Sequence, residues 1–129
     1  MDYYISKKLQ HQDFEVAIAQ VTEVLKKWGF GILTTIDVQH TLKEKIGTEF
    51  RKYKILGACN PHFAHKALLM EDKIGVLLPC NVVVQQFDDG TIEIAAMKPS
   101  GAMSVVENPS LEAIANEVEQ IMNKVIEAL

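Results

Sequence analysis

The chain has 129 residues, of which 48% are hydrophobic and 23% are charged, and its formal net charge is −4 at pH 7. This length and composition are typical of one globular domain and exclude a disordered chain. The negative balance disfavours binding to nucleic acid through bulk attraction to phosphates, and no apolar run reaches the roughly 20 residues of a membrane span.

Apolar periodicity predicts alternating strands and helices in the first half of the chain. In order, these are a strand over residues 3–9, a helix over 14–28, a strand over 30–38, a short helix opened by a capping box at 41–44, and a strand over 50–59. Asp13 is the expected N-cap of the first helix. Gly29 and Gly47 suit the left-handed position that follows a helix, so we expect each to end one.

The second half begins with an Asn60-Pro61 helix start, in which asparagine caps and proline takes the first helical position. The predicted elements are a helix to residue 71, a strand over 74–84, a strand over 91–97, a loop over 98–107, and a helix from Asn108-Pro109 to 129. Asp89-Gly90 is a tight-turn signal between the two strands. Pro79 interrupts the ladder of the strand over 74–84 and indicates an edge position, a bend or a bulge there.

The order β-α-β-(short α)-β-α-β-β-α predicts a single α+β domain over residues 1–129, with helices on a largely antiparallel sheet. The strand over 74–84 is almost wholly apolar, which is typical of a strand covered on both faces. An apolar strand at a sheet edge would also favour association, so we predict a homo-oligomer, most simply a dimer.

Two cysteines do not make a disulfide framework, and the first residues lack the layout of a signal peptide. We therefore expect a cytoplasmic protein with reduced thiols. If the strands over 50–59 and 74–84 are antiparallel neighbours, Cys59 ends one and Cys80 lies about six residues into the other. That separation is too large for a disulfide.

Side chains that can do chemistry are concentrated in residues 55–84, where each cysteine is followed by an asparagine. Cys59 precedes a helix N-terminus, where a thiol can become nucleophilic or bind a ligand. Cys80 lies at the proline-marked break, and such breaks often redirect side chains toward a site. The ligand-binding candidates are thus Cys59, Asn60, Cys80 and Asn81. Against this, both cysteines could simply fill the core, and capping alone explains Asn60.

A metal site is a weaker hypothesis. His62 and His65 are three residues apart on the predicted helix, and with Cys59 they offer one thiol and two imidazoles, which zinc and copper accept. The same spacing is common on solvated helix faces. No Walker loop, dinucleotide fingerprint, CxxC, GxSxG or HExxH motif is present, so nothing in the sequence suggests dinucleotide binding or classical hydrolysis, and the identity of any cofactor stays unknown.

Two short motifs resemble a known family. They are Gly57-Ala58-Cys59-Asn60-Pro61 and Leu78-Pro79-Cys80-Asn81-Val82. With them, nearly the whole chain resembles the family catalogued as domain of unknown function three hundred and two. The resemblance implies a curved antiparallel sheet crossed by helices, like the TATA-box-binding-protein fold class, and it implies no activity. Members that resemble this chain often carry Asp-Pro after the last strand, where this chain has Lys98-Pro99.

Three functions remain open at this point. The first is a small module that binds a ligand or metal near Cys59 and Cys80. The second is an enzyme or redox protein that uses Cys59, although a nucleophilic cysteine needs a base nearby. The third is a dimeric interaction protein with two structural cysteines. Rapid alkylation of one cysteine near neutral pH would favour the first two functions over the third.

Overall fold

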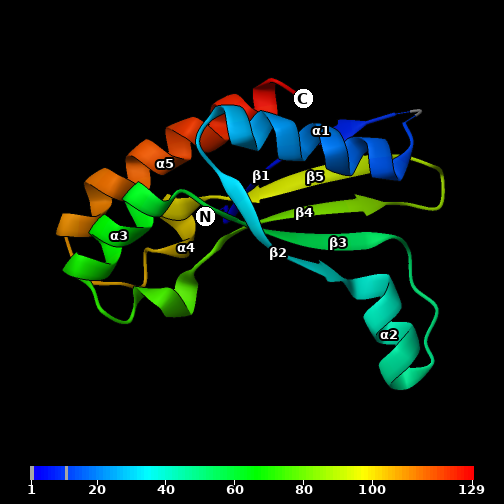
Figure 1. Cartoon of the computed structure of the whole chain (residues 1–129), viewed down its shortest axis with the longest axis horizontal. Coiled ribbons are helices and arrows are strands. Elements are labelled where there is room, and N and C mark those ends of the chain that lie inside the picture. Colours follow the sequence, from blue (N-terminus) through cyan, green and yellow to red (C-terminus); the bar gives the residue numbers. More distant parts are fainter. Residues whose placement is uncertain (1, 11) are drawn as a thin grey trace.

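Five antiparallel strands form one open sheet in the order β1-β5-β4-β3-β2 in the computed structural model, which describes residues 2–10 and 12–129 (Figure 1). The strands are β1 (Tyr4–Leu9), β2 (Gly31–Asp37), β3 (Tyr53–Cys59), β4 (Cys80–Gln86) and β5 (Ile92–Met97). The chain therefore has the α+β architecture that the sequence predicted. β4 is the central strand, and β1 and β2 are the edges.

Two long helices, α1 (Phe14–Lys27) and α5 (Ser110–Glu127), cover one face of this sheet (Figure 1). Each presents an apolar stripe to the strands, because residues three and four apart lie on the same side of a helix. The largest fully buried side chains on this face come from both layers and include Val21, Leu25, Leu56, Val82, Val84, Ile92, Ile94, Met122 and Val125. Burying each such side chain stabilises the fold by roughly 1.5–3 kcal/mol before entropy is counted.

The ends of α1 form as expected. The Asp13 carboxylate accepts hydrogen bonds from the backbone N–H groups of Glu15 and Val16, at 2.9 and 3.1 Å. Gly29 follows the helix with a φ of 84°, a left-handed conformation that glycine adopts without a steric penalty. At the same end, the ring of Trp28 lies 5.3 Å from Lys124 Nζ of α5, so the two helices meet there.

A second group of helices lies beyond the end of β3 and the start of β4 (Figure 1). It consists of α3 (Pro61–Met70), the 3-10 turn η1 (Ile74–Leu77), the short helix α4 (Pro99–Ala102) and the first turns of α5. Ala67, Ile74 and Leu111 form a small apolar core between them. α5 therefore packs on the sheet with its C-terminal part and on this helical group with its N-terminal part.

The predicted strand over 74–84 is wrong in its first half. Ile74–Leu77 is the turn η1, the Leu78–Pro79 peptide is cis, and β4 begins only at Cys80. The run is apolar throughout because its two halves enter two different cores: Ile74 joins the helical group, and the residues from Cys80 onward join the sheet. Since β4 is central, the argument for a dimer through an apolar edge strand does not hold.

Smaller differences concern how elements begin. The second helix, α2 (Val38–Ile46), starts earlier than the capping box suggested, because the Asp37 carboxylate accepts the His40 N–H at 3.0 Å. β3 starts at Tyr53 rather than at residue 50. The expected loop over 98–107 contains α4, with Pro99 in its first turn. Asn108 still accepts the backbone N–H of Ser110, at 3.1 Å, where α5 begins.

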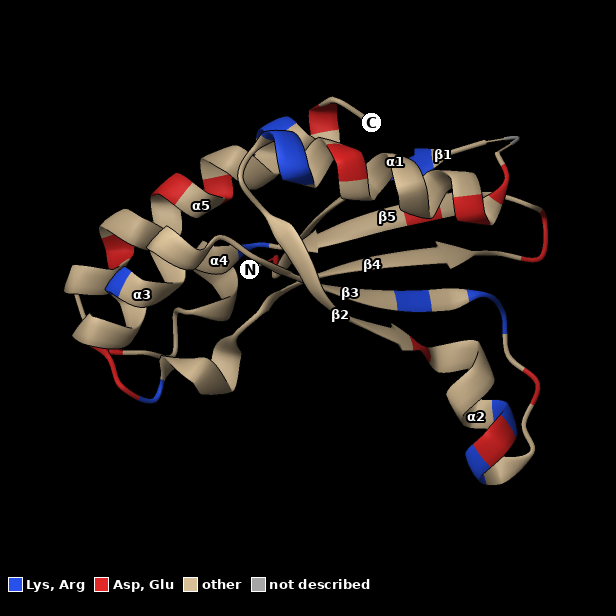
Figure 2. Ribbon diagram, viewed as in Figure 1, with Lys and Arg blue, Asp and Glu red and all other residues tan. Residues whose placement is uncertain are grey.

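The second face of the sheet lies opposite α1 and α5, and we call it the open face. Alternation along the strands places Tyr4, Tyr53, Ile55, Val83, Ala95 and Met97 on this face. α2 projects from one end of the sheet toward the side of this face, while the helical group with α3 and η1 lies at the other end (Figure 1). Charged residues lie mainly on the outer helices and the loops, and β4 carries none (Figure 2).

Candidate functional site

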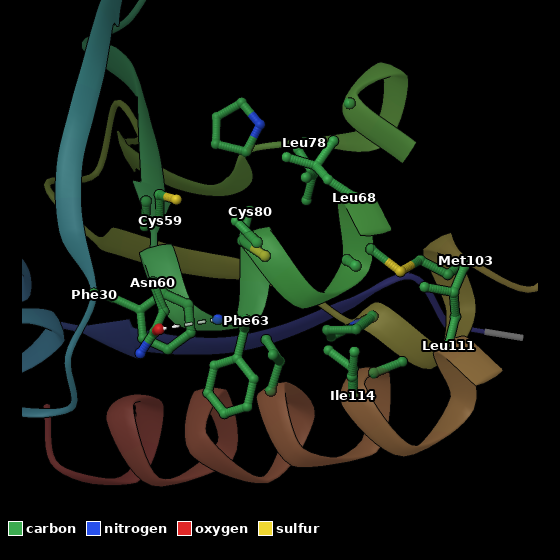
Figure 3. Close-up of a pocket in the computed structure, with 18 of the residues that line it drawn as sticks. Phe30, Cys59, Asn60, Phe63, Leu68, Leu78, Cys80, Met103, Leu111 and Ile114 are labelled. Atoms are coloured by element: carbon green, nitrogen blue, oxygen red, sulfur yellow. Dashed lines mark hydrogen bonds between the residues drawn. The ribbon is translucent and has the colours of Figure 1, made fainter. Parts of the chain in front are cut away.

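A cavity of about 330 Å³ lies where β3 and β4 meet the helical group (Figure 3). α3, η1, α4 and α5 surround it, and both cysteines are on its wall. The remaining wall is mainly aliphatic and aromatic, including Phe30, Phe63, Leu68, Met103, Leu111 and Ile114. Such a space, apolar and with few polar groups, is the usual form of a small-molecule pocket.

Small side chains leave this space unfilled. Ala58 on β3, Ala64 and Ala67 on α3, and Ala115 on α5 all line the cavity. Larger residues at these positions would extend into it, because protein interiors are otherwise close-packed. The cavity thus follows from alanines placed on a strand and two helices that converge at one point.

The two cysteines are neighbours. Cys80 pairs with Ala58 across β3 and β4, so Cys59, the next residue, lies beside it at the strand end. Both are free thiols and both line the cavity (Figure 3). The predicted separation of about six residues is wrong, because β4 begins at Cys80 instead of at residue 74.

Burial controls the chemistry of Cys80. Only 8% of this residue is exposed. Burial raises the pKa of the Cys80 thiol to about 11, and repulsion from the negative charge that Cys59 can carry contributes further. Cys80 is therefore a neutral thiol at neutral pH and a poor nucleophile.

Asn60 caps α3 as the sequence predicted. Its side-chain oxygen accepts the backbone N–H groups of His62, at 3.0 Å, and Phe63, at 3.3 Å. The Ala64 N–H donates to the Asn60 carbonyl oxygen. Because these donors are already occupied, they are not free to stabilise a thiolate at Cys59. Asn60 nevertheless lines the cavity and supplies one of its few polar groups.

The other candidates lie elsewhere. Asn81 follows Cys80 in β4 and projects from the opposite side of the sheet, where it is exposed beside the open face. Strand alternation requires this separation. His62 and His65 are exposed on α3, and neither is among the described residues that line the cavity. Within residues 2–10 and 12–129, no group of three or more His, Cys, Asp or Glu side chains is arranged to hold a metal ion.

Sequence reasoning missed the wall that α4 and α5 provide. Pro99, Met103, Leu111, Ile114 and Val118 reach the cavity from the last third of the chain. The apolar stripe of the last helix was visible in the sequence, but a stripe does not show that its first turns face a space instead of a core. Pro99, in the first turn of α4, is buried at this wall.

Comparisons with known proteins show the family and the fold of this chain. Residues 5–129 match the family described as Domain of unknown function DUF302. The chain is also similar to an uncharacterised conserved DUF302 protein from Bacillus stearothermophilus whose crystal structure is known. The two are 29% identical, the match covers 97% of this chain and 96% of that one, and the TM-score is 0.88. No curated protein matches the sequence. In the described part of the chain, no helix is both long and apolar enough to cross a bilayer.

Proposed function

The chain belongs to the DUF302 family, and we propose that it binds a small apolar molecule in the cavity between its two cysteine motifs. The observation that carries this proposal is the composition of the wall, in which two thiols and Asn60 lie among aliphatic and aromatic side chains. A volume of about 330 Å³ lies within the range of small-molecule sites. Each CH₂ group that leaves water on binding contributes about 0.8 kcal/mol.

The cavity opens to the surface beside apolar residues. Leu33 and Leu68 line it and are still 67% and 44% exposed. An apolar ligand would contact these two side chains first and then pass to the buried wall formed by Cys80 and Leu111. Exposed leucines beside a pocket support the proposal, since a contiguous apolar surface of this kind often marks a binding site.

Binding is better supported than thiol chemistry. A nucleophilic cysteine needs a base, and the histidines closest in sequence to Cys59 are on the exposed side of α3. The Asn60 cap occupies the helix N–H groups that would otherwise activate a thiolate. Two free thiols also fit a reducing compartment, so we place the protein in the cytoplasm as part of this proposal.

The test uses N-phenylnaphthylamine, an uncharged probe whose fluorescence rises in apolar surroundings. We expect saturable fluorescence with the native protein and displacement of the probe by decanol. Ala64→Leu, on the cavity wall, should lower the affinity for the probe at least tenfold because the larger side chain occupies the space. Ala19→Leu makes the same change at an exposed position on α1 and serves as the control.

Two results would contradict the proposal. One is probe fluorescence that does not saturate or that decanol does not reduce. The other is an equal affinity for the probe in Ala64→Leu and Ala19→Leu, when circular dichroism shows both variants to be folded. Either result would leave the cavity as a packing defect with no ligand.

A further inference from the structure

The open face has an apolar centre. Ile55 on β3, Val83 on β4, and Ala95 and Met97 on β5 lie there and are half-buried. At the two edges, Tyr4 on β1 is 44% exposed and Ile36 on β2 is 48% exposed. An antiparallel sheet with one solvated face ordinarily places polar residues on that face. We propose that the open face binds the same face of a second copy of this chain, with α2 of each copy lying against its partner.

One end of the open face carries a polar rim of both signs. Arg51 Nε donates to Gln85 Oε1 at 2.9 Å, and Gln85 Nε2 donates to Glu93 Oε1 at 3.2 Å. In the register of β1 and β5, Lys8 lies opposite Glu93. A mixed rim around an apolar centre is the usual anatomy of a protein interface. A mixed rim disfavours nucleic acid as the partner, because phosphates bind surfaces that are positively charged throughout.

This rim is also complementary to itself. In a two-fold dimer the same patch meets its copy, so a surface of one sign would repel its partner. Here Lys8 and Arg51 of one copy can face Glu93 of the other. The Arg51 guanidinium is already held, 4.5 Å from the centre of the Phe50 ring and 5.2 Å from that of Phe87. Little side-chain freedom would be lost when it pairs, which favours association.

α2 provides the second observation. Among its residues, Val38–Ile46, none is buried, and Ile46 is 68% exposed. Both ends are nevertheless defined, by Asp37 at the start and by Gly47 at the end, with a φ of 67°. A nine-residue helix is marginal in water on its own, and tertiary packing normally stabilises it. Val38, Leu42 and Ile46 are four residues apart and so form one apolar stripe that a second copy can cover.

The available area fits a dimer. Five strands about 4.8 Å apart, each about six residues long at roughly 3.3 Å per residue, give a flat footprint of about 500 Å². α2 adds about 140 Å², from its length of roughly 14 Å and a width of about 10 Å. Protruding side chains add surface to this flat footprint. The area that could be buried therefore approaches the ~800 Å² that each partner contributes to a stable interface. The proposal uses this face and does not depend on ligand binding at the cavity.

The test is the mass of the intact protein in solution. Light scattering and sedimentation at about 50 μM should give twice the chain mass of 14.4 kDa. Val83→Glu places a charge at the centre of the open face, and Ile46→Glu places one on exposed α2. Both should raise the dissociation constant at least a hundredfold and yield the monomer mass. Val16→Glu makes the same change at an exposed position of α1, on the opposite side of the molecule, and should leave the dimer intact.

Ile46→Glu keeps the test decisive if Val83→Glu impairs folding, because Ile46 has few contacts within its own chain. Native protein that gives only the monomer mass at 50 μM overturns the proposal, and would leave the face free for a different partner. A dimer that persists in Ile46→Glu overturns it as well, since the two copies would then associate through another surface.

Discussion

Pro79 packs so closely against Gly57 that a Cβ added to this glycine would lie 2.8 Å from Pro79 Cγ. The same Cβ would meet the side chain of Thr34 on β2. Gly57 is therefore the point at which β2, β3 and the segment before β4 converge. This contact holds Pro79, and with it Cys80, at the cavity.

Gly57→Ala should destabilise the protein. The added methyl group cannot displace the Pro79 ring without moving the backbone, so we expect the free energy of unfolding to fall by about 1–3 kcal/mol. Gly31→Ala is the matched control, because its Cβ would have no neighbour within 4 Å in an equivalent β setting. Urea denaturation of the two variants checks this. Equal unfolding free energies for Gly57→Ala and Gly31→Ala would show that the Pro79 ring moves aside at little energetic cost.

Cys80 should make the stability depend on pH in the alkaline range. Its pKa is raised from 9.0 to about 11 in the folded chain, so the unfolded chain loses the thiol proton first as the pH rises. The contribution is fully present below about pH 9 and is lost between about pH 9 and 11. This contribution to the free energy of unfolding is on the order of 2–3 kcal/mol. The measurement is the alkaline fall in unfolding free energy, which should be shallower in Cys80→Ala than in the native chain. If the unfolding free energies of Cys80→Ala and the native chain fell equally with rising pH, this prediction would be wrong.

Serine substitutions should separate the two cysteines. Cys59→Ser should cost under about 1–2 kcal/mol of stability, because Cys59 is only half-buried, and should weaken probe binding. Cys80→Ser places a hydroxyl in a buried apolar site and should cost about 1–3 kcal/mol. Melting temperatures and probe affinities of both variants decide this. A large loss of stability with unchanged binding in Cys59→Ser would make Cys59 a packing residue.

Asn60→Ala should lower the free energy of unfolding by about 1 kcal/mol, because the N–H groups of His62 and Phe63 lose their acceptor. Asn60→Asp keeps an oxygen at the same position and should retain most of that stability. Chemical denaturation of the pair tests the capping role. If Asp proved as damaging as Ala, the side-chain nitrogen of Asn60 would matter more than its oxygen.

The sequence predicted the element order, the sheet class and the caps at Asp13 and Asn60, because these depend on local patterns. It failed at residues 74–84, where two apolar environments follow each other with no polar residue to mark the boundary. The cavity shows the same limit. Cys59, Asn60 and Cys80 could be named as candidates from their residue types and two short motifs, whereas Leu111 and Ile114 line the same cavity only through the packing of α5 on α3.

The contact of Trp28 with Lys124 links the fluorescence of this indole to α5. Trp28 is the single tryptophan of the chain, and it lies against the C-terminal part of the helix whose first turns form the cavity wall. Because α5 runs without a break from Ser110 to Glu127, a ligand that displaces its first turns should also change the surroundings of this indole. We therefore expect the emission of Trp28 to report cavity occupancy without any added label.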